Sequence, residues 1–423
     1  MFFAPCNRDC RDRREPVKNF TRRDFLQLAG LTCGTFMTRE ALGGEPTKGR
    51  VSQQVQKSFF LPGEDLAEDE MRITFLGTSP IPRIAQAATS IFVEVGTGDS
   101  FVFDCGTGVT AKYIAMGIPY SRMDKIFLTH LHADHTTDLM FIYCFGPSGD
   151  RKTNQHVWGP TGDSPREGTR FFCEKLREMT EWHRESFSFL STGLKNGEDA
   201  YNLVTHELPY MEIGTAYESR GVKITHFPAV HSRNGSISYK LEWNGLKMVF
   251  SGDTRPNKYM IEQAKGVDVL IHEMVLPPEI WGSKNTGTEK GDKGFDEAVS
   301  IWKDIQDSSH TLPKALGYIL SKTRPRLGVA THFQDNPDTI GPVFADVRKW
   351  YDGPFVIAGD LMVLNVSKKT IRHRTALVSN YAWPASLQTN EGQLATPKYK
   401  SPLDQINNTL KQKLIPEKIY TRA

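Results

Sequence analysis

Residues 125–135 place three histidines and one aspartate directly after an apolar run that is typical of a β-strand. Side chains two positions apart at a strand end point the same way, so His130 and His132 can converge on one ion. The turn that follows brings Asp134 and His135 round to a second ion nearby. Imidazole nitrogens with a carboxylate oxygen suit zinc best, and iron or manganese are the other candidate metals. This segment therefore predicts two adjacent metal half-sites.

Other residues of metal-ligand type lie at or just beyond the ends of predicted strands. They are Asp104, His231, Asp253, His272, Glu273 and His332. Strand ends that share one edge of a sheet form a natural site, because side chains from neighbouring strands meet there. The chain has only 12 histidines in 423 residues, so chance clustering is a poor explanation of this placement. His310 is left open, either as a residue that lines the site or as part of a surface loop.

The order of strand and helix patterns predicts a layered α/β fold. Strands are predicted at 71–76, 90–95, 101–104, 125–129, 222–225, 236–243, 248–251, 267–271, 326–331, 355–358 and 362–366, and helices at 109–116, 138–145, 166–187, 258–264, 296–305, 313–321 and 342–350. Asn244-Gly245 between two alternating runs indicates a hairpin, and Thr311 is predicted to cap the helix that contains Pro313. Hairpins followed by strand–helix alternation favour two sheets enclosed by helices.

The first 43 residues carry features of an export signal. Scattered basic residues precede the sequence Thr-Arg-Arg-Asp-Phe-Leu-Gln at 21–27, and a weakly apolar stretch follows. This arrangement resembles a twin-arginine signal, with Ala41 and Gly43 as small residues near a cleavage point, and a disordered basic tail is the alternative. The resemblance implies export of the folded protein to the periplasm or beyond, which suits an enzyme that needs its metal inserted first.

Composition sets the remaining bounds. A 39% hydrophobic and 24% charged content describes a globular chain, and a net charge of +3 is too small to imply nucleic acid by itself. No apolar run is long enough to cross a bilayer. Residues 44–70 are interpreted as a polar linker, 71–375 as the folded domain with an inserted helical segment at 146–210, and 376–423 as a loose C-terminal tail.

Several motifs resemble those of metallo-β-lactamase-fold hydrolases, and within that group of the ribonuclease Z-like branch. They are Phe-Leu-Gly-Thr at 75–78, Phe-Asp-Cys-Gly-Thr-Gly at 103–108, the cluster at 130–135, Ser-Gly-Asp-Thr-Arg-Pro at 251–256, Ile-His-Glu at 271–273 and Thr-His-Phe at 331–333. Trp-Gly-Pro at 158–160 and Leu-Glu-Trp-Asn-Gly at 241–245 are also similar to members labelled as guanitoxin-biosynthesis hydrolases. The resemblance implies an α/β fold, the αββα sandwich of two β-sheets flanked by helices.

The resemblance also implies a dinuclear centre that binds two Zn²⁺ ions. Mn²⁺ and Fe²⁺ are the alternative metals. The implied ligands are His130, His132 and His231 for one ion, Asp134, His135 and His332 for the other, and Asp253 as the bridge between them. Two cations lower the pKa of shared water to about neutrality, which would give a bridging hydroxide as the nucleophile. Asp104 would accept a hydrogen bond that orients one of the ligands.

Catalytic roles follow from the same resemblance. Asp134 would act through its metal, and His272 of the Ile-His-Glu motif would donate a proton to the leaving group with support from Glu273. A structural salt bridge is the alternative role for Glu273. Relatives that use the fold only for binding usually lose ligands, and this chain keeps all seven, so we expect an enzyme.

The spacing of the motifs bears on the substrate. Resemblance to single-domain ribonuclease Z implies a flexible basic arm between the third histidine motif and the bridging aspartate, but His231 and Asp253 lie only 22 positions apart. The helical pattern after residue 166 carries charges of mixed sign, which is typical of a solvated face rather than of a phosphate track. Export would also separate the protein from tRNA precursors. True β-lactam hydrolases of this fold lack a bridging aspartate, so Asp253 argues against that activity.

We therefore expect an exported dinuclear-metal hydrolase that cleaves an ester or phosphodiester of a small-molecule substrate. The alternatives are a ribonuclease Z-type tRNA 3′ endonuclease or phosphodiesterase and a lactonase or arylsulfatase-like hydrolase, and a non-catalytic binding relative is least favoured. Nucleic acid is a disfavoured partner, and a homodimer is left open.

Overall fold

The computed structural model describes residues 58–187 and 199–385, which all fall in one compact unit of the chain. The predicted signal at 1–43 and most of the predicted tail at 376–423 lie outside the described residues. Within the described part, no helix is both long and apolar enough to cross a membrane.

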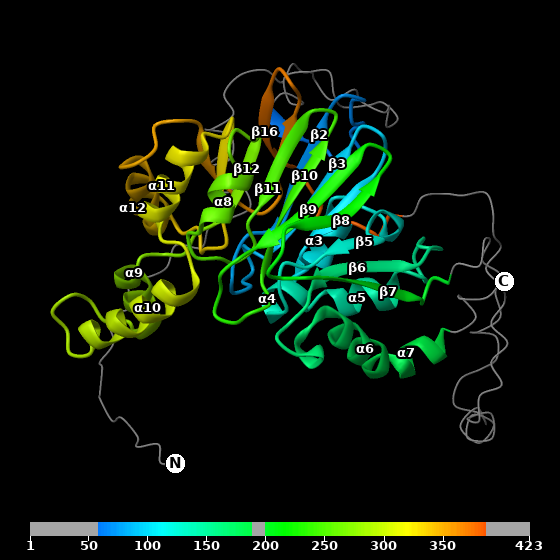
Figure 1. Cartoon of the computed structure of the whole chain (residues 1–423), viewed down its shortest axis with the longest axis horizontal. Helices are drawn as coiled ribbons and strands as arrows, with labels where there is room; N and C mark the ends of the chain where they lie inside the picture. The colour runs from blue at the N-terminus through cyan, green and yellow to red at the C-terminus, as the bar shows by residue number, and fades with distance from the viewer. Residues whose placement is uncertain (1–57, 188–198, 386–423) are drawn as a thin grey trace, which may run out of the picture. The chain divides into compact units, whose positions relative to one another are not determined.

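Two β-sheets form the centre of this unit (Figure 1). In the described residues the first sheet has nine strands, in the spatial order β1 (Phe59–Phe60), β16 (Ile371–Ala376), β15 (Met362–Val366), β2 (Met71–Gly77), β3 (Ser90–Val95), β4 (Ser100–Phe103), β5 (Lys125–Phe127), β6 (Gln155–Pro160) and β7 (Leu203–Leu208). The second has seven, in the order β14 (Phe355–Ile357), β13 (Leu327–Thr331), β12 (Val269–Glu273), β11 (Leu246–Phe250), β10 (Ile237–Trp243), β9 (Val222–Pro228) and β8 (Gly214–Ser219). Asn244 and Gly245 join β10 to β11 with φ of 50° and 78°, the positive values that a type I′ hairpin turn requires.

The two sheets bury one shared apolar core. Alternate side chains of β2, among them Ile73 and Phe75, pack against Tyr239 of β10 and Ile271 of β12 from the other sheet. Successive strand residues face opposite sides, so Leu270 of β12 points away from this core into the layer of helices. Each fully buried side chain of this size stabilises the fold by roughly 1.5–3 kcal/mol.

Helices cover the outer face of each sheet. The first sheet packs against α3 (Val109–Ala115), α5 (Leu139–Phe145) and α6 (Thr169–Met179), and the second against α8 (Lys258–Gln263), α11 (Pro313–Thr323) and α12 (Pro337–Arg348). The remaining helical elements are η1 (Tyr120–Arg122), α4 (Ala133–Thr136), η2 (Pro165–Glu167), α7 (Glu181–Ser186), α9 (Pro278–Thr286) and α10 (Phe295–Ser309). The order helix, sheet, sheet, helix confirms the αββα sandwich (Figure 1).

Two segments are more structured than the sequence predicted. The predicted linker at 44–70 includes β1, which pairs in parallel with β16 and buries Phe60, so the fold begins before Met71. The predicted helical insertion at 146–210 also supplies β6 and β7, which extend the edge of the first sheet. Both strands of this insertion are flanked by loops and lie far from their partners in sequence, so local patterns did not reveal them.

The boundaries of three helices differ from those predicted from the sequence. The helix predicted at 342–350 begins at Pro337, because Asn336 and Thr339 form a capping box, and Pro342 lies inside it. Thr311 does not cap α11, because the N-cap of this helix is Leu312. The hydroxyl of Thr311 instead donates to the carbonyl oxygen of Thr254 at 2.7 Å. The helix predicted at 166–187 is interrupted at Thr180, which separates α6 from α7.

Candidate metal centre

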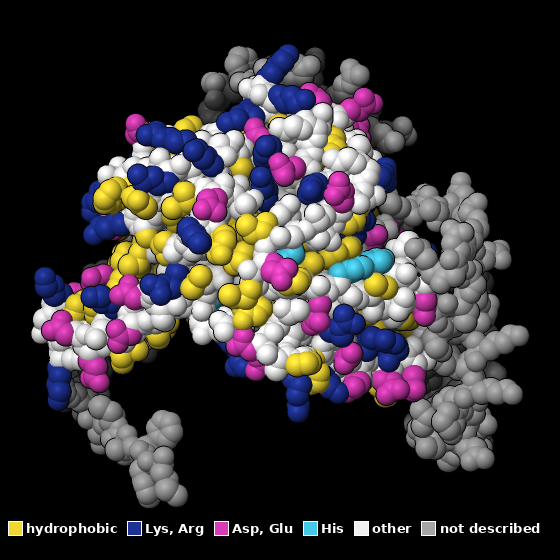
Figure 2. Space-filling view, viewed as in Figure 1, with side chains coloured by type: hydrophobic (Ala, Val, Ile, Leu, Met, Phe, Trp, Pro, Cys, Tyr) yellow, Lys and Arg dark blue, Asp and Glu magenta, His cyan; other side chains and the backbone are white. Residues whose placement is uncertain are grey.

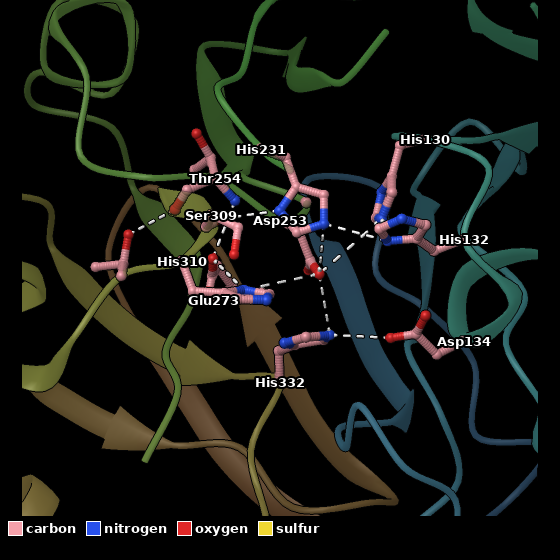
Figure 3. A network of polar contacts seen from close by, with 12 residues as sticks. His130, His132, Asp134, His231, Asp253, Thr254, Glu273, Ser309, His310 and His332 are labelled. Carbon is pink, nitrogen blue, oxygen red and sulfur yellow. Dashed lines mark hydrogen bonds and ion pairs between the residues drawn. The ribbon is translucent and has the colours of Figure 1, made fainter. Parts of the chain in front are cut away.

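Three histidines from two loops bring their ring nitrogens together (Figure 3). His130 and His132 follow β5, and His231 follows β9. The Nδ1 atom of His132 lies 3.0 Å from Nε2 of His130 and 3.1 Å from Nε2 of His231. Ligand nitrogens at about 2 Å from a tetrahedral metal are roughly 3.3 Å apart, so these three atoms have the spacing of one metal half-site.

Close backbone contact holds these loops in place. Gly252, with a φ of 56°, approaches Thr129 so closely that an added Cβ would lie 2.5 Å from the Cβ of Thr129. The carbonyl oxygen of Thr129 accepts a hydrogen bond from the backbone N–H of Ile237 at 2.9 Å. The loop after β5 is therefore tied to the loops of the second sheet that carry His231 and Asp253.

A second group consists of one aspartate from α4 and three buried residues. Asp134, His135, Asp253 and His332 offer ligand atoms that all lie within 4.8 Å of one another. Nε2 of His332 is 3.2 Å from Oδ2 of Asp134 and 3.3 Å from Oδ2 of Asp253. Nε2 of His135 is 3.3 Å from Oδ1 of Asp253. This group has the composition of the other predicted half-site.

Asp253 lies between the two groups. Its Oδ2 is 4.0 Å from Nε2 of His130 and 3.8 Å from Nε2 of His231, while both of its oxygens face the second group. Figure 3 shows its carboxylate at the centre of the contacts. A carboxylate whose Oδ2 lies near both groups would be placed to contact cations held by either of them.

Neighbouring groups fix which ring nitrogen each histidine presents. Nδ1 of His135 donates to Oδ2 of Asp104 at 2.7 Å, so its Nε2 faces the cluster. Asp104 also accepts from the backbone and hydroxyl of Thr129, both at 2.8 Å. Nδ1 of His231 donates to the carbonyl oxygen of Ser309 at 2.8 Å. Such hydrogen bonds select the tautomer and orient the imidazole toward a metal.

Electrostatics keep the first group neutral and the carboxylates ionised. Burial lowers the pKa of His130 well below its usual value, and burial likewise lowers the pKa of His132 and His231 despite nearby carboxylates. Burial alone would raise the pKa of Asp253, but His332 and His135 outweigh it and hold that pKa well below its usual range. Neutral imidazoles and ionised carboxylates are the forms that bind cations.

Two buried ligand atoms that make no hydrogen bond show that these residues fit a metal. Oδ1 of Asp253 and Nε2 of His135 are buried and lie 3.3 Å apart, but neither makes a hydrogen bond, although such groups in native proteins nearly always do. Burying a carboxylate oxygen without a hydrogen bond is costly. The chemistry of the donors, imidazole nitrogen and carboxylate oxygen, matches zinc, manganese or iron, and a bound cation would satisfy both atoms.

His310 joins the centre where the sequence predicted His272. Its Nδ1 lies 3.0 Å from Oε1 of Glu273 and 3.9 Å from Oδ2 of Asp253 (Figure 3). Burial lowers the pKa of His310, but the charge and hydrogen bond of Glu273 together with the charges of Asp253 and Asp134 outweigh burial and raise it to about 9. The backbone N–H of Thr254 donates to the same oxygen of Glu273 at 3.0 Å, which holds the carboxylate.

The structure does not bring His272 into either metal-ligand group. Its Nδ1 donates to the carbonyl oxygen of Glu273 at 2.7 Å, its Nε2 is buried without a partner, and burial lowers its pKa. Because His272 and Glu273 are consecutive on β12, their side chains point to opposite faces of the sheet. With Glu273 facing the centre, His272 lies on the face of Leu270, toward the helices.

Comparison with known proteins agrees with this arrangement, which is that of a metallo-β-lactamase-type hydrolase. The chain belongs to the beta-lactamase superfamily, because the model of the beta-lactamase superfamily domain matches residues 100–333. The fold of this family implies binding of a divalent metal, and both the predicted fold and the predicted metal dependence are confirmed at that level.

Several similar curated proteins are named as ribonucleases. The chain is 25% identical over 333 residues to ribonuclease Z of Archaeoglobus fulgidus, across 70% of this chain and 98% of the relative. It is 25% identical over 268 residues to ribonuclease BN of an Enterobacter species, across 55% and 85%. The short form of human tRNase Z is a similar solved structure, with 21% identity, a TM-score of 0.49 and coverage of 69% of this chain and 98% of that one. The predicted likeness to ribonuclease Z is confirmed, while the likeness to guanitoxin-biosynthesis hydrolases stays a prediction.

Proposed function

We propose that this protein is a divalent-metal-dependent phosphodiesterase of the ribonuclease Z type that acts on RNA. The observation that carries the proposal is the joining of two metal-ligand groups through Asp253, with the His310–Glu273 pair beside them. The names of the curated relatives support a phosphodiester in RNA over an ester of a small molecule. This proposal adopts the ribonuclease Z-type activity, which the sequence analysis gave as an alternative. It replaces the expected hydrolase of a small-molecule substrate.

Metals bound by the two groups, two zinc ions in our proposal, would supply Lewis acidity toward a phosphoryl oxygen and the nucleophilic oxygen. The residues of the chain would orient the ligand side chains and transfer protons around that centre. Asp104 and Ser309 hold the rings of His135 and His231 in the required tautomers. His310, whose pKa the nearby carboxylates raise to about 9 and whose Nδ1 lies 3.0 Å from Glu273, is the residue that would donate a proton to the leaving oxygen.

The connection from His231 to Asp253 bears on how RNA is held. It consists of β10, β11 and the turns around them, and so provides no long basic arm. On the face shown in Figure 2, Lys and Arg side chains lie among Asp and Glu side chains, and α6 and α7 carry a cluster of mixed charge at Glu174, Arg177, Glu178, Glu181 and Arg184. A test of function must therefore compare short diesters with a full tRNA precursor.

The purified protein is expected to hydrolyse bis(p-nitrophenyl) phosphate and to remove the 3′ extension from a tRNA precursor. Both activities should disappear after EDTA treatment and return with Zn²⁺ or Mn²⁺, because the centre needs its cations. The measurement is initial rate on these two substrates, on an aryl sulfate and on a lactone, together with metal analysis. If the sulfate or the lactone is hydrolysed faster than both phosphodiesters, the proposal is wrong. The expectation of a hydrolase that acts on a small substrate would then be favoured.

Export is proposed separately, on the resemblance of residues 21–27 to a twin-arginine signal. Replacing Arg22 and Arg23 together by lysine is expected to retain the protein in the cytoplasm, because lysine keeps the charge but removes the arginine pair that the pathway reads. Cell fractionation of a bacterial host that has this pathway measures the outcome. Equal distribution of the double-lysine variant and the wild type would show that the segment is not such a signal.

A further inference from the structure

A cavity of about 210 Å³ opens beside the first metal-ligand group. Its lining includes the three histidines of that group together with Glu167, Arg233, Asn234 and Gly235. Asp253 and His310 are not part of this lining. A substrate bound at the centre can therefore place the portion that keeps the phosphate in the cavity, while its leaving oxygen lies on the side of His310.

Arg233 is held at the wall of this cavity by the loop that follows the metal ligand His231. Its guanidinium pairs with Glu167 of η2. The next residue, Asn234, donates to Asp163 at 2.9 Å. Gly235, with a φ of 101°, brings the same loop against the loop at residues 161–162, where an added Cβ would lie 3.0 Å from a carbonyl oxygen. Three consecutive residues thus fix the loop against the segment that leads into α6.

The charge of Arg233 is available to a ligand. It is the one Lys or Arg among the residues that line this cavity, and its side chain is 69% exposed. An exposed ion pair such as that with Glu167 contributes only about 0–1 kcal/mol, so the guanidinium can change partners at small cost. Its forked donors match the oxygens of a phosphate. As Arg233 is two residues beyond His231, their Cα atoms are at most about 7 Å apart.

We propose that Arg233 is a specificity-determining residue that binds a second phosphate of the substrate, one nucleoside beyond the scissile phosphate on the side that retains it. This inference rests on the proposed phosphodiesterase function and narrows it to substrates with more than one phosphate. Glu167 holds the guanidinium in the free protein and yields it when that phosphate binds. The cleavage chemistry itself stays with the metal centre and His310.

Two matched substrates test this role. Thymidine 5′-(p-nitrophenyl phosphate) is compared with the same compound carrying an added 3′-phosphate, and kcat/KM is measured for each with the metal-loaded full chain. The wild type is expected to prefer the 3′-phosphorylated compound about tenfold, the scale of one charge-assisted contact. Arg233→Gln is expected to remove most of this preference, chiefly through KM, and Arg233→Lys to keep part of it.

Arg324→Gln is the matched control, because Arg324 is 65% exposed and pairs with Asp352 in the same way but does not line the cavity. It is expected to keep the wild-type preference. No preference in the wild type, or an unchanged preference in Arg233→Gln, would overturn the inference while leaving the phosphodiesterase intact. Failure of the wild type to cleave either compound would overturn both the inference and the proposed function.

Discussion

Replacing Asp253 by alanine is expected to lower kcat/KM for bis(p-nitrophenyl) phosphate by at least about 10³-fold, the scale of losing a main electrostatic element of an active site. Asp253 belongs to the second ligand group and also lies next to the first, with His332 at 3.3 Å and His231 at 3.8 Å from its Oδ2. Its loss also leaves His135 and His332 without their central anion. The same variant is therefore expected to bind less than one metal per chain, as measured by elemental analysis.

Asp360→Asn is the matched control for this substitution. The side chain of Asp360 is also nearly covered, accepts hydrogen bonds from Thr78 and Ala87, and pairs with Lys112 at 3.0 Å, but it belongs to neither ligand group. Its amide is expected to lower the melting temperature while metal content and rate per folded molecule stay near those of the wild type. A similar loss of metal in both variants would mean that Asp253 acts through stability alone.

His310→Gln is expected to lower kcat by about 10²–10⁴-fold, the range for removing a positioned proton donor. Glutamine cannot protonate a leaving oxygen, although it keeps the size and polarity of the side chain. Metal content should stay at the wild-type value, because His310 contacts Glu273 more closely than it does Asp253. The loss of kcat is expected to be smaller for a substrate whose leaving group needs no proton, such as p-nitrophenol, than for one that releases an RNA 3′ oxygen. This difference in kcat identifies His310 as the proton donor.

His272→Gln separates the structural assignment from the sequence-based one. His272 is fully buried and belongs to neither ligand group, so its replacement is expected to lower stability by roughly 1–3 kcal/mol and to change kcat only a few-fold. Urea unfolding and steady-state kinetics on the same preparation give both numbers. If His272→Gln loses as much of kcat as His310→Gln, the proton donor predicted from the Ile-His-Glu motif is the right one.

The convergence of the candidate ligand residues could be predicted from sequence where each residue follows its strand closely. His130, Asp253 and His332 come within three residues of the end of a strand, and the strands that carry them are apolar and easily recognised. Their convergence follows from the order of strands in the two sheets. The local pattern and the global site therefore agree.

The position of His310, the proton donor that we propose, could not be predicted with the same information. The choice between His272 and Glu273 depends on which face of β12 meets the centre, and a shift of one residue reverses the answer. His310 reaches the centre because α10 ends beside His231, with Ser309 accepting its hydrogen bond. The residues around His310 do not indicate where the end of α10 lies relative to the two ligand groups. The position of His310 therefore follows only from the folded structure.

The two-residue strand β1 has a consequence for handling the molecule. It covers the outer side of β16, with Phe59 opposite Thr375 and Phe60 opposite Ala376. A chain shortened to begin at Met71, where the sequence alone placed the start of the domain, would uncover the backbone N–H and carbonyl groups of that edge. Unprotected edge strands recruit other strands, so such a shortened chain would be prone to self-association even with its metal centre complete.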